Sequence, residues 1–201
     1  MTEPAYKIDF PGQDWPAQGH WTYEDYLRLP KDGRRYEVIR GHLYVTAAPN
    51  FDHQFAVTQL GRLFGNFLDG RALGTVLVAP FEILLPRGIA DPVQPDLLFF
   101  RIGNGPQPGA GSFEGVPDLV VEVLSPRTRR RDEKVKLAAY RDAGVPEVWL
   151  ADPQRRNVVV HGFDDNGRFI ELARAGAGEI VASRLLSGLR IAIDQIFPQP
   201  L

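Results

Sequence analysis

Hydrophobic and polar residues alternate with two different periods along the chain, and these periods predict its first helix and strands. The segment YEDYLRL has the pattern of a short helix, with Thr22 as its N-cap and Pro30 at its end. RRYEVIRGHLYVTAA then alternates as two strands on either side of Arg40-Gly41. Because these two residues suit a tight turn, the pattern predicts a β-hairpin.

A longer helix is expected next, followed by two further strands. Apolar residues recur at helical spacing up to about Leu68, and Asn50 or Asp52 can cap the start of this helix. Residues 74–86, GTVLVAPFEILLP, predict two strands interrupted at Ala79-Pro80.

The middle of the chain contains its most hydrophobic strands. LLFF follows Pro95-Asp96, and the next segment, RIGNGPQPGAGSFEG, is too rich in Gly and Pro to form an element. DLVVEVL is apolar on both faces, which is typical of a strand covered on both sides, and only Glu122 interrupts it. A helix is expected from about Arg130 to Ala143, followed by strands at PEVWLAD, NVVVHGF and RFIELAR.

This order of elements predicts an α/β fold with a central mixed β-sheet flanked by helices and with additional strands toward the C-terminus. The 201 residues, 44% of them hydrophobic, suffice for one substantial core. Residues 1–20 are rich in Pro, Gly and Gln and are expected to form an extended, mobile N-terminal arm. Residues 21–201 are expected to form a single domain.

Composition narrows the classes of function. The formal charge of -2 gives no overall positive field, so any nucleic-acid contact must come from local basic patches. The absence of cysteine excludes disulfides, thiol catalysis and Cys-ligated zinc, and the four histidines lack the i, i+4 spacing of a zinc protease. No apolar run has the length of a membrane span and no signal-peptide core is found, so a cytoplasmic protein without a membrane partner is expected.

Glu122 is the residue that most needs a chemical explanation. A carboxylate within an apolar strand is costly to desolvate and needs a cation, a hydrogen-bond partner or a raised pKa. Asp118 shares its face but lies about 13 Å away, since each strand residue rises about 3.3 Å. Asp96 is the better partner if its strand pairs beside DLVVEVL. Two such carboxylates, together with a main-chain carbonyl and waters, suit a hard cation such as Mg2+ or Mn2+.

The predicted helix downstream supplies a positive charge. Asp132, Lys136 and Tyr140 stand at i, i+4 and i+8 and therefore form one stripe along the helix. An ammonium group at Lys136 can offset the charge of Glu122 and, in phosphodiester hydrolysis, orient the attacking water or stabilise the transition state. Lys134 is displaced by two residues and is expected to face elsewhere.

Each of these residues also has a structural interpretation. Glu122 and Lys136 can form a buried ion pair without a metal, and Asp96 can be a strand-start residue after a proline. Tyr140 can simply pack in the core, and Asp132 can simply favour the N-terminus of its helix by its charge. We assign Asp118, which follows Pro117, to the structural role of a strand-start residue.

The longest motif of the chain resembles a known family, the Uma-type branch of the PD-(D/E)XK nuclease superfamily. The resemblance rests on QPDLLFF and on GVPDLVVEVLSPRTRRRDEKVKLAAYRDAGVPEVWLADP, extends to WTYEDYLRLPKDGRRYEVIRGHLYV, and spans about Trp21 to Pro198. PD alone is a common dipeptide, whereas EVLSPxT and GVPEVWLAD are far more specific. The resemblance implies a restriction-endonuclease-like core and an enzyme that hydrolyses phosphodiester bonds in DNA with Mg2+ or Mn2+.

The resemblance also implies roles for single residues. Asp96 corresponds to the superfamily's Pro-Asp aspartate and Glu122 to the acidic residue of its second half-motif, so both would bind the metal. Leu124 stands where the simplest motif has lysine, and Lys136 would be the displaced equivalent. Glu37 matches an acidic position near such active sites, although a strand glutamate usually faces solvent.

Other residues bear on the partners of the protein. The run Arg127, Arg129, Arg130 and Arg131 is most often a solvated cluster, but beside a metal site it can bind DNA phosphates without reading sequence. His53 can line the cleft as a phosphate or water contact, or it can be a surface residue in the first turn of its helix. A homodimer would suit the cleavage of two strands, with aromatic residues such as Trp149 or Phe197 at its interface.

The rival interpretation is a catalytically inactive, nuclease-like scaffold that binds nucleic acid or protein. The presence of Asp96, Glu122 and Lys136 together favours the enzyme, because a binding module would not require all three. The enzyme hypothesis requires the two carboxylates to meet on neighbouring strands and on the same side of the sheet.

Overall fold

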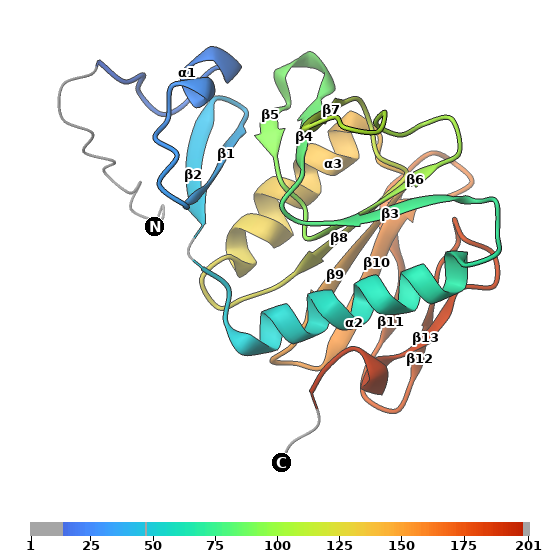
Figure 1. Cartoon of the computed structure of the whole chain (residues 1–201). Helices are drawn as coiled ribbons and strands as arrows, with labels where there is room; N and C mark the ends of the chain where they lie inside the picture. Colours follow the sequence, from blue (N-terminus) through green and yellow to red (C-terminus); the bar gives the residue numbers. More distant parts are fainter. Residues whose placement is uncertain (1–13, 47, 199–201) are drawn as a thin grey trace.

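A six-stranded mixed β-sheet forms the centre of the protein in the computed structural model, which describes residues 14–46 and 48–198 (Figure 1). Its strands are β3 (Gly74–Val78), β6 (Leu97–Arg101), β8 (Leu119–Val123), β9 (Glu147–Asp152), β10 (Asn157–Phe163) and β11 (Phe169–Ala175). Their order is β11-β10-β9-β8-β6-β3, with β8 and β9 parallel and the other neighbours antiparallel. The predicted central mixed sheet is therefore confirmed.

Helices cover both faces of this sheet. The helix α2 (Phe51–Leu68) packs its buried residues, such as Leu60 and Phe64, against one face. A π-helical segment, η2 (Arg131–Lys136), continues into α3 (Leu137–Ala143) on the other face, where Tyr140 is buried. Figure 1 shows α2 and α3 on opposite sides of the central strands. Since β8 lies in the middle of these layers, both of its faces are buried, which explains its continuous apolar pattern.

A second sheet of five strands lies over the face that carries α3. Its strands are β1 (Arg35–Ile39), β2 (His42–Thr46), β4 (Glu82–Leu85), β5 (Ala90–Val93) and β7 (Ser112–Glu114), in the order β2-β1-β5-β4-β7. Ile39 and Ile83 of this sheet belong to the same hydrophobic core as Leu98 and Val120 of the central sheet. This shared core joins the second sheet to the central one.

The N-terminal part forms the predicted helix and hairpin. Thr22 caps α1 (Tyr23–Leu27) in a capping box with Asp25. At the hairpin turn, Arg40 and Gly41 both have positive φ, at 51° and 71°, as the mirror-image turns of hairpins require. Gln18 exchanges two hydrogen bonds with the backbone of Leu43. The expected mobile arm includes residues 1–13, which lie outside the described residues, whereas residues 14–20 include contacts that attach them to the hairpin.

Several short elements differ from the sequence prediction. The strand β7 lies in the segment assigned to an irregular loop, so that assignment is wrong for residues 112–114, which pair in parallel with β4. The strand β5 lies in IADPVQP and is not predicted from the sequence, because Pro92 within it and Pro95 after it disfavour a strand. A C-terminal hairpin, β12 (Ile180–Ala182) and β13 (Arg190–Ala192), and the 3-10 turns η1 (Pro86–Gly88) and η3 (Ile193–Gln195) complete the chain. The strand β7 depends on its pairing with the distant β4, so local pattern could not reveal it.

Trp149 and Phe197 belong to the core of the monomer. Both side chains are buried between the central sheet, α2 and the C-terminal hairpin, and Trp149 packs edge-on against Phe64. The expectation that they could contribute to a dimer interface is wrong, because neither side chain reaches the surface.

Candidate functional site

Asp96 and Glu122 lie opposite each other on neighbouring antiparallel strands. The register of β6 and β8 pairs Leu97 with Val121, so the next residues outward on each strand are Asp96 and Glu122. Residues directly opposite in an antiparallel pair project to the same face. Both carboxylates are deeply buried, with 4% and 2% of their surface exposed. The sequence expectation that these strands pair, with both residues on one side, agrees with this geometry.

Lys136, at the end of η2, contacts two carboxylates of the site, those of Glu122 and Glu37. Its Nζ lies 2.7 Å from Oε1 of Glu122 and 3.0 Å from Oε1 of Glu37. Burial alone would lower the pKa of Lys136, but the charges of Glu122 and Glu37 outweigh it and raise the pKa above its usual value. Lys134 is exposed to solvent, as expected from its position two residues earlier.

Lys136 ends a π-helical segment rather than a regular α-helical turn. The backbone N–H of Leu137 donates to the carbonyl of Asp132, five residues earlier. Such π segments widen the helix locally and are frequent at functional sites. One turn further on, the hydroxyl of Tyr140 donates a hydrogen bond of 2.5 Å to Oε1 of Glu122. The predicted stripe of Asp132, Lys136 and Tyr140 is buried together against the central sheet.

Glu37 enters the site from β1 and is 1% exposed, so it does not face solvent. Its Oε1 accepts a hydrogen bond of 2.8 Å from the backbone N–H of Gln94 and contacts Lys136. Arg131 Nη2 lies 3.6 Å from Oε2. Burial raises the pKa of Glu37, but the positive charges of Lys136, Arg131 and Arg35 outweigh this effect and lower the pKa to about 2. Glu37 is therefore ionised.

Asp96 is held by three donors around its carboxylate. Oδ2 accepts 2.9 Å from the backbone N–H of Val123 and lies 3.1 Å from Nε2 of His53, while Nη1 of Arg35 lies 3.2 Å from Oδ1. Burial raises the pKa of this carboxyl, but the His53 hydrogen bond and the charges of His53, Arg35 and Lys136 hold it well below its usual range. His53 thus has a place beside Asp96, in addition to its backbone N–H being capped by Asn50.

Sequence reasoning missed Arg35 and Gln94. The side chain of Arg35 donates through Nε to Oε1 of Gln94 and through Nη1 to Asp96. Because side chains two apart on a strand share a face, the position of Arg35 two residues before Glu37 was the available signal. Gln94 offers no such signal, since its backbone N–H makes the contact to Glu37.

With all of its carboxylates ionised, the site would contain more negative than positive charge. Its four carboxylates, Glu37, Asp96, Glu122 and Asp132, face the cations of Arg35, Arg131 and Lys136. Burial first, and then the charges of Asp96, Asp132 and Glu37, raise the pKa of Glu122 to about 8 despite Lys136. Burial also raises the pKa of Asp132. An additional cation would relieve this excess.

The donor set fits a hard divalent cation at Asp96 and Glu122. Carboxylate oxygens are the ligands that Mg2+ and Mn2+ prefer, and Mg2+ takes few protein ligands. Within the described residues, Oε2 of Glu37 and Oδ1 of Asp132 are buried without a hydrogen-bond partner, which marks unused acceptor capacity at the site. Residues 14–46 and 48–198 hold no group of three or more His, Asp or Glu side chains placed to bind a metal, so any ion would depend on two carboxylates and other oxygens.

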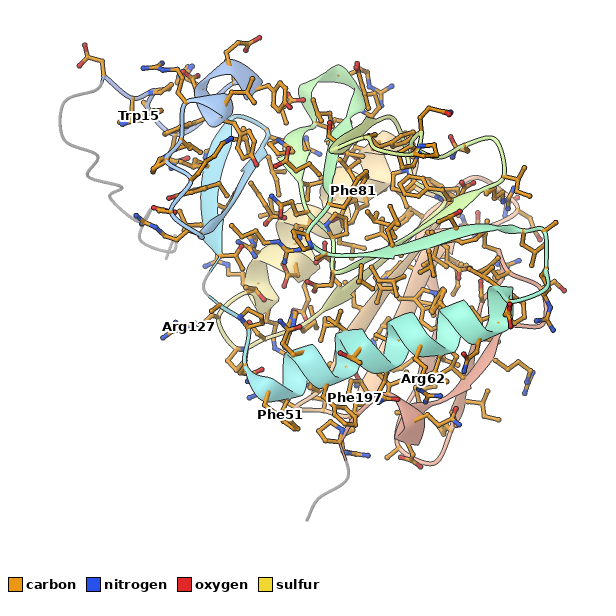
Figure 2. All side chains as sticks on the ribbon, in the orientation of Figure 1. Trp15, Phe51, Arg62, Phe81, Arg127 and Phe197 are labelled. Carbon is orange, nitrogen blue, oxygen red and sulfur yellow. The ribbon has the colours of Figure 1, made fainter. Side chains whose placement is uncertain are left out.

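The arginine run divides into two groups. Arg129 donates two hydrogen bonds, of 2.6 and 2.9 Å, to the carboxylate of Asp152. Arg131 is buried, where it donates to Oγ1 of Thr46 and approaches Glu37. These two arginines are therefore engaged inside the protein. Arg127 and Arg130 are exposed, and Figure 2 shows Arg127 projecting outward on the side where α2 begins.

Other sequence expectations concern positions outside this site. Asp118 accepts hydrogen bonds from the backbone N–H of Arg101 and from the side chain of Asn104, consistent with the structural role assigned to it. No helix in the described part of the chain combines the length and apolar character that crossing a membrane would need.

Comparison with known proteins gives a family and a fold. The model of a family described as "Uma2: Putative restriction endonuclease" matches residues 23–194. A crystal structure described as "a putative nuclease belonging to DUF820", from Anabaena variabilis ATCC 29413, has the same fold. It aligns with a TM-score of 0.72 and 19% sequence identity, over 88% of this chain and 97% of that chain. No curated protein matches the chain.

Proposed function

Since the chain belongs to the Uma2 family, we propose that it is a nuclease that hydrolyses phosphodiester bonds in DNA with Mg2+ or Mn2+. The observation that carries the proposal is the meeting of Asp96 and Glu122 on one face of the sheet, with the ammonium group of Lys136 2.7 Å from Glu122. A buried set of acids with a strongly perturbed pKa is typical of catalytic sites.

Asp96 and Glu122 would hold the divalent cation. When bound, such an ion neutralises the scissile phosphate and makes water a stronger nucleophile. His53, Arg35 and the N–H of Val123 fix the Asp96 carboxylate and keep it ionised. Tyr140 fixes Glu122 through its hydroxyl. Both acids would thus be oriented before substrate arrives, which reduces the reorganisation required during the reaction.

Lys136 would act on the phosphodiester group directly. Its ammonium group stays protonated because Glu122 and Glu37 surround it. From this position it can donate a hydrogen bond to the attacking water or to a phosphate oxygen that gains charge in the transition state. Glu37, which is ionised, balances the charge of Lys136 and holds its Nζ in place.

Cleavage of plasmid DNA by purified protein with Mg2+ or Mn2+ tests the proposal. Glu122→Gln keeps the shape and hydrogen bonds of the protonated side chain, and it should lower the cleavage rate at least about 100-fold without unfolding the protein. Asp118→Asn is the matched control, because it changes a buried carboxyl before the same strand but outside the site. Absence of wild-type cleavage, or equal cleavage by Glu122→Gln, would contradict the proposal.

The inactive scaffold is a second candidate, favoured by one observation. Lys136 forms ion pairs with both Glu37 and Glu122, so the protein's own side chains compensate these charges, as they would in a purely structural network. Calorimetric titration with Mn2+ separates the two functions. The nuclease should bind Mn2+ and lose that binding on Asp96→Asn, whereas an inert scaffold should give the same signal in both proteins.

A further inference from the structure

A groove of about 250 Å3, lined by both apolar and charged side chains, lies beside the site, over the strands β9, β10 and β11. We call it the β9–β11 groove. Its floor is apolar and includes Leu150 and Val159, while its rim carries the basic side chains of Lys134, Arg155 and Arg174. An apolar floor can pack against a sugar ring, and basic side chains at the rim can bind phosphate groups.

The groove and the candidate site lie at the same end of the central strands. Leu150 on β9 is the direct partner of Glu122 in the parallel register of β8 and β9. Lys134 stands two residues before Lys136 on η2 but points outward, so the helix separates the groove from the buried carboxylates. A strand of DNA leaving the site around the start of this helix would enter the groove.

A second hollow, at the opposite end of the same strands, provides a comparison. It has a volume of about 210 Å3 and is lined by Arg101, Arg184 and Glu147, among others. Glu147 pairs with Leu119, three residues from Glu122 along β8, which corresponds to roughly 10 Å. These two basic hollows are similar in size, and of the two it is the β9–β11 groove that adjoins Glu122.

The charge of the groove is available to an anion. Two acidic residues, Glu133 and Asp152, also line it, but Arg129 binds Asp152 through two hydrogen bonds and compensates its charge. The Arg155 side chain is 66% exposed and lies 3.8 Å from Asp152, which is a weak contact. Arg174 donates two hydrogen bonds to Glu171, but both side chains are exposed, so water screens this pair and the guanidinium group stays accessible.

The size of the groove argues against a compact metabolite. Small-molecule sites usually occupy about 300–1,000 Å3 and enclose most of their ligand. The β9–β11 groove is smaller and carries its basic groups on long exposed side chains, which suits an extended backbone with charges repeated along it.

We propose that the β9–β11 groove binds the sugar–phosphate backbone of DNA next to the cleavage position, with Lys134, Arg155 and Arg174 contacting successive phosphates. The choice of DNA rests on the proposed nuclease function, and the groove extends the binding surface beyond the exposed Arg127 and Arg130. Because phosphates carry no sequence information, these contacts would add affinity without selecting a sequence.

Binding of a fluorescent duplex by Glu122→Gln protein, measured by anisotropy at several salt concentrations, tests the proposal. Adding Lys134→Glu and Arg155→Glu should weaken binding at least about tenfold at low salt and reduce the salt dependence by about one unit per lost phosphate contact. The control is Arg101→Glu with Arg184→Glu, which reverses the same number of charges at the second hollow and should leave the affinity within about twofold.

The outcomes separate the groove from the nuclease activity. Equal weakening by the two double variants, or no binding of DNA at all, overturns the groove proposal. If the groove proposal fails in this way but wild-type protein cleaves DNA, the proposed nuclease function stands without the groove. Groove-dependent binding of DNA by a wild-type protein that cleaves nothing would support the groove and overturn the nuclease.

Discussion

Lys136 places its ammonium nitrogen 2.7 Å from Oε1 of Glu122, although the two residues come from different elements. The simplest nuclease motif would place the lysine two residues after the glutamate, where this chain has Leu124. The helix after β8 turns back over the sheet and supplies the charge from the following element instead. Variants of this pair therefore test whether Lys136 performs the role that the lysine of the simplest motif would perform.

Replacing Lys136 with Met should abolish cleavage and destabilise the fold. Loss of one partner leaves Glu122 and Glu37 buried beside each other, at a cost of about 3–5 kcal/mol. The double variant Lys136→Met, Glu122→Gln should recover much of the free energy of unfolding but none of the activity, because the uncompensated charge at Glu122 is removed. Urea unfolding and plasmid cleavage measure the two effects. Wild-type cleavage by fully folded Lys136→Met protein would show that Lys136 only balances charge.

The ion pair of Arg129 with Asp152 should make the free energy of unfolding decrease at acid pH. Burial raises the pKa of Asp152, but the Arg129 hydrogen bonds, and those of two backbone N–H groups, lower it below its usual value. A lowered folded-state pKa stabilises the protein above about pH 4 and loses that contribution as the pH falls through the folded-state pKa. Arg129→Gln should therefore cost about 2 kcal/mol near pH 6 and flatten the pH dependence below about pH 4. Urea unfolding from pH 3 to pH 7 measures both; an unchanged slope would mean that Arg129 contributes little to the acidity of Asp152.

Two glycines should respond in opposite ways to alanine. At Gly74, which begins β3, an added Cβ would lie 2.0 Å from the carbonyl oxygen of Phe100, so Gly74→Ala should cost about 2–4 kcal/mol. At Gly65 in α2, an added Cβ would meet nothing within 4 Å, so Gly65→Ala should stabilise the helix by about 0.5–1 kcal/mol. Thermal unfolding compares the two; stabilisation at Gly74 would contradict the close approach of β3 to β6.

Glu147 should prove essential to stability but separate from the chemistry. This buried carboxylate accepts four hydrogen bonds, two at Oε1 from Trp149 and Ser183 and two at Oε2 from the backbone N–H groups of Arg184 and Leu185. In Glu147→Gln an NH2 group must face two of these donors, which should cost about 1–3 kcal/mol. The expected result is a lower melting temperature with an unchanged cleavage rate at low temperature. A specific loss of cleavage in fully folded Glu147→Gln protein would contradict this separation.

Local sequence predicted the long and strongly patterned elements. The helix α2 was expected with a cap at Asn50 or Asp52, of which the structure uses Asn50, and the hairpin with its turn at Arg40-Gly41. Both were predictable because capping and turn chemistry act within a few residues. The strand β7 escaped prediction because its partner β4 comes from a distant segment. The strand β5 escaped because Pro92 disfavours a strand, although its partner β4 is close in sequence. The π-helical turn before Lys136 also escaped, since nothing in the pattern of RDEKVK distinguishes it from an α-helix.

For the site, the sequence by itself identified the residues whose charge needs a partner inside the protein. Glu122 in an apolar strand needed a partner, and the spacing of Lys136 and Tyr140 identified the helix that could provide it. Only the tertiary structure decided that Asp96 stands opposite Glu122, that Arg35 and Glu37 enter from a second sheet, and that Arg129 and Arg131 are engaged internally. The physical reason is that the cost of burying a charge is a local property, whereas its compensation depends on which distant chain segments pack above it.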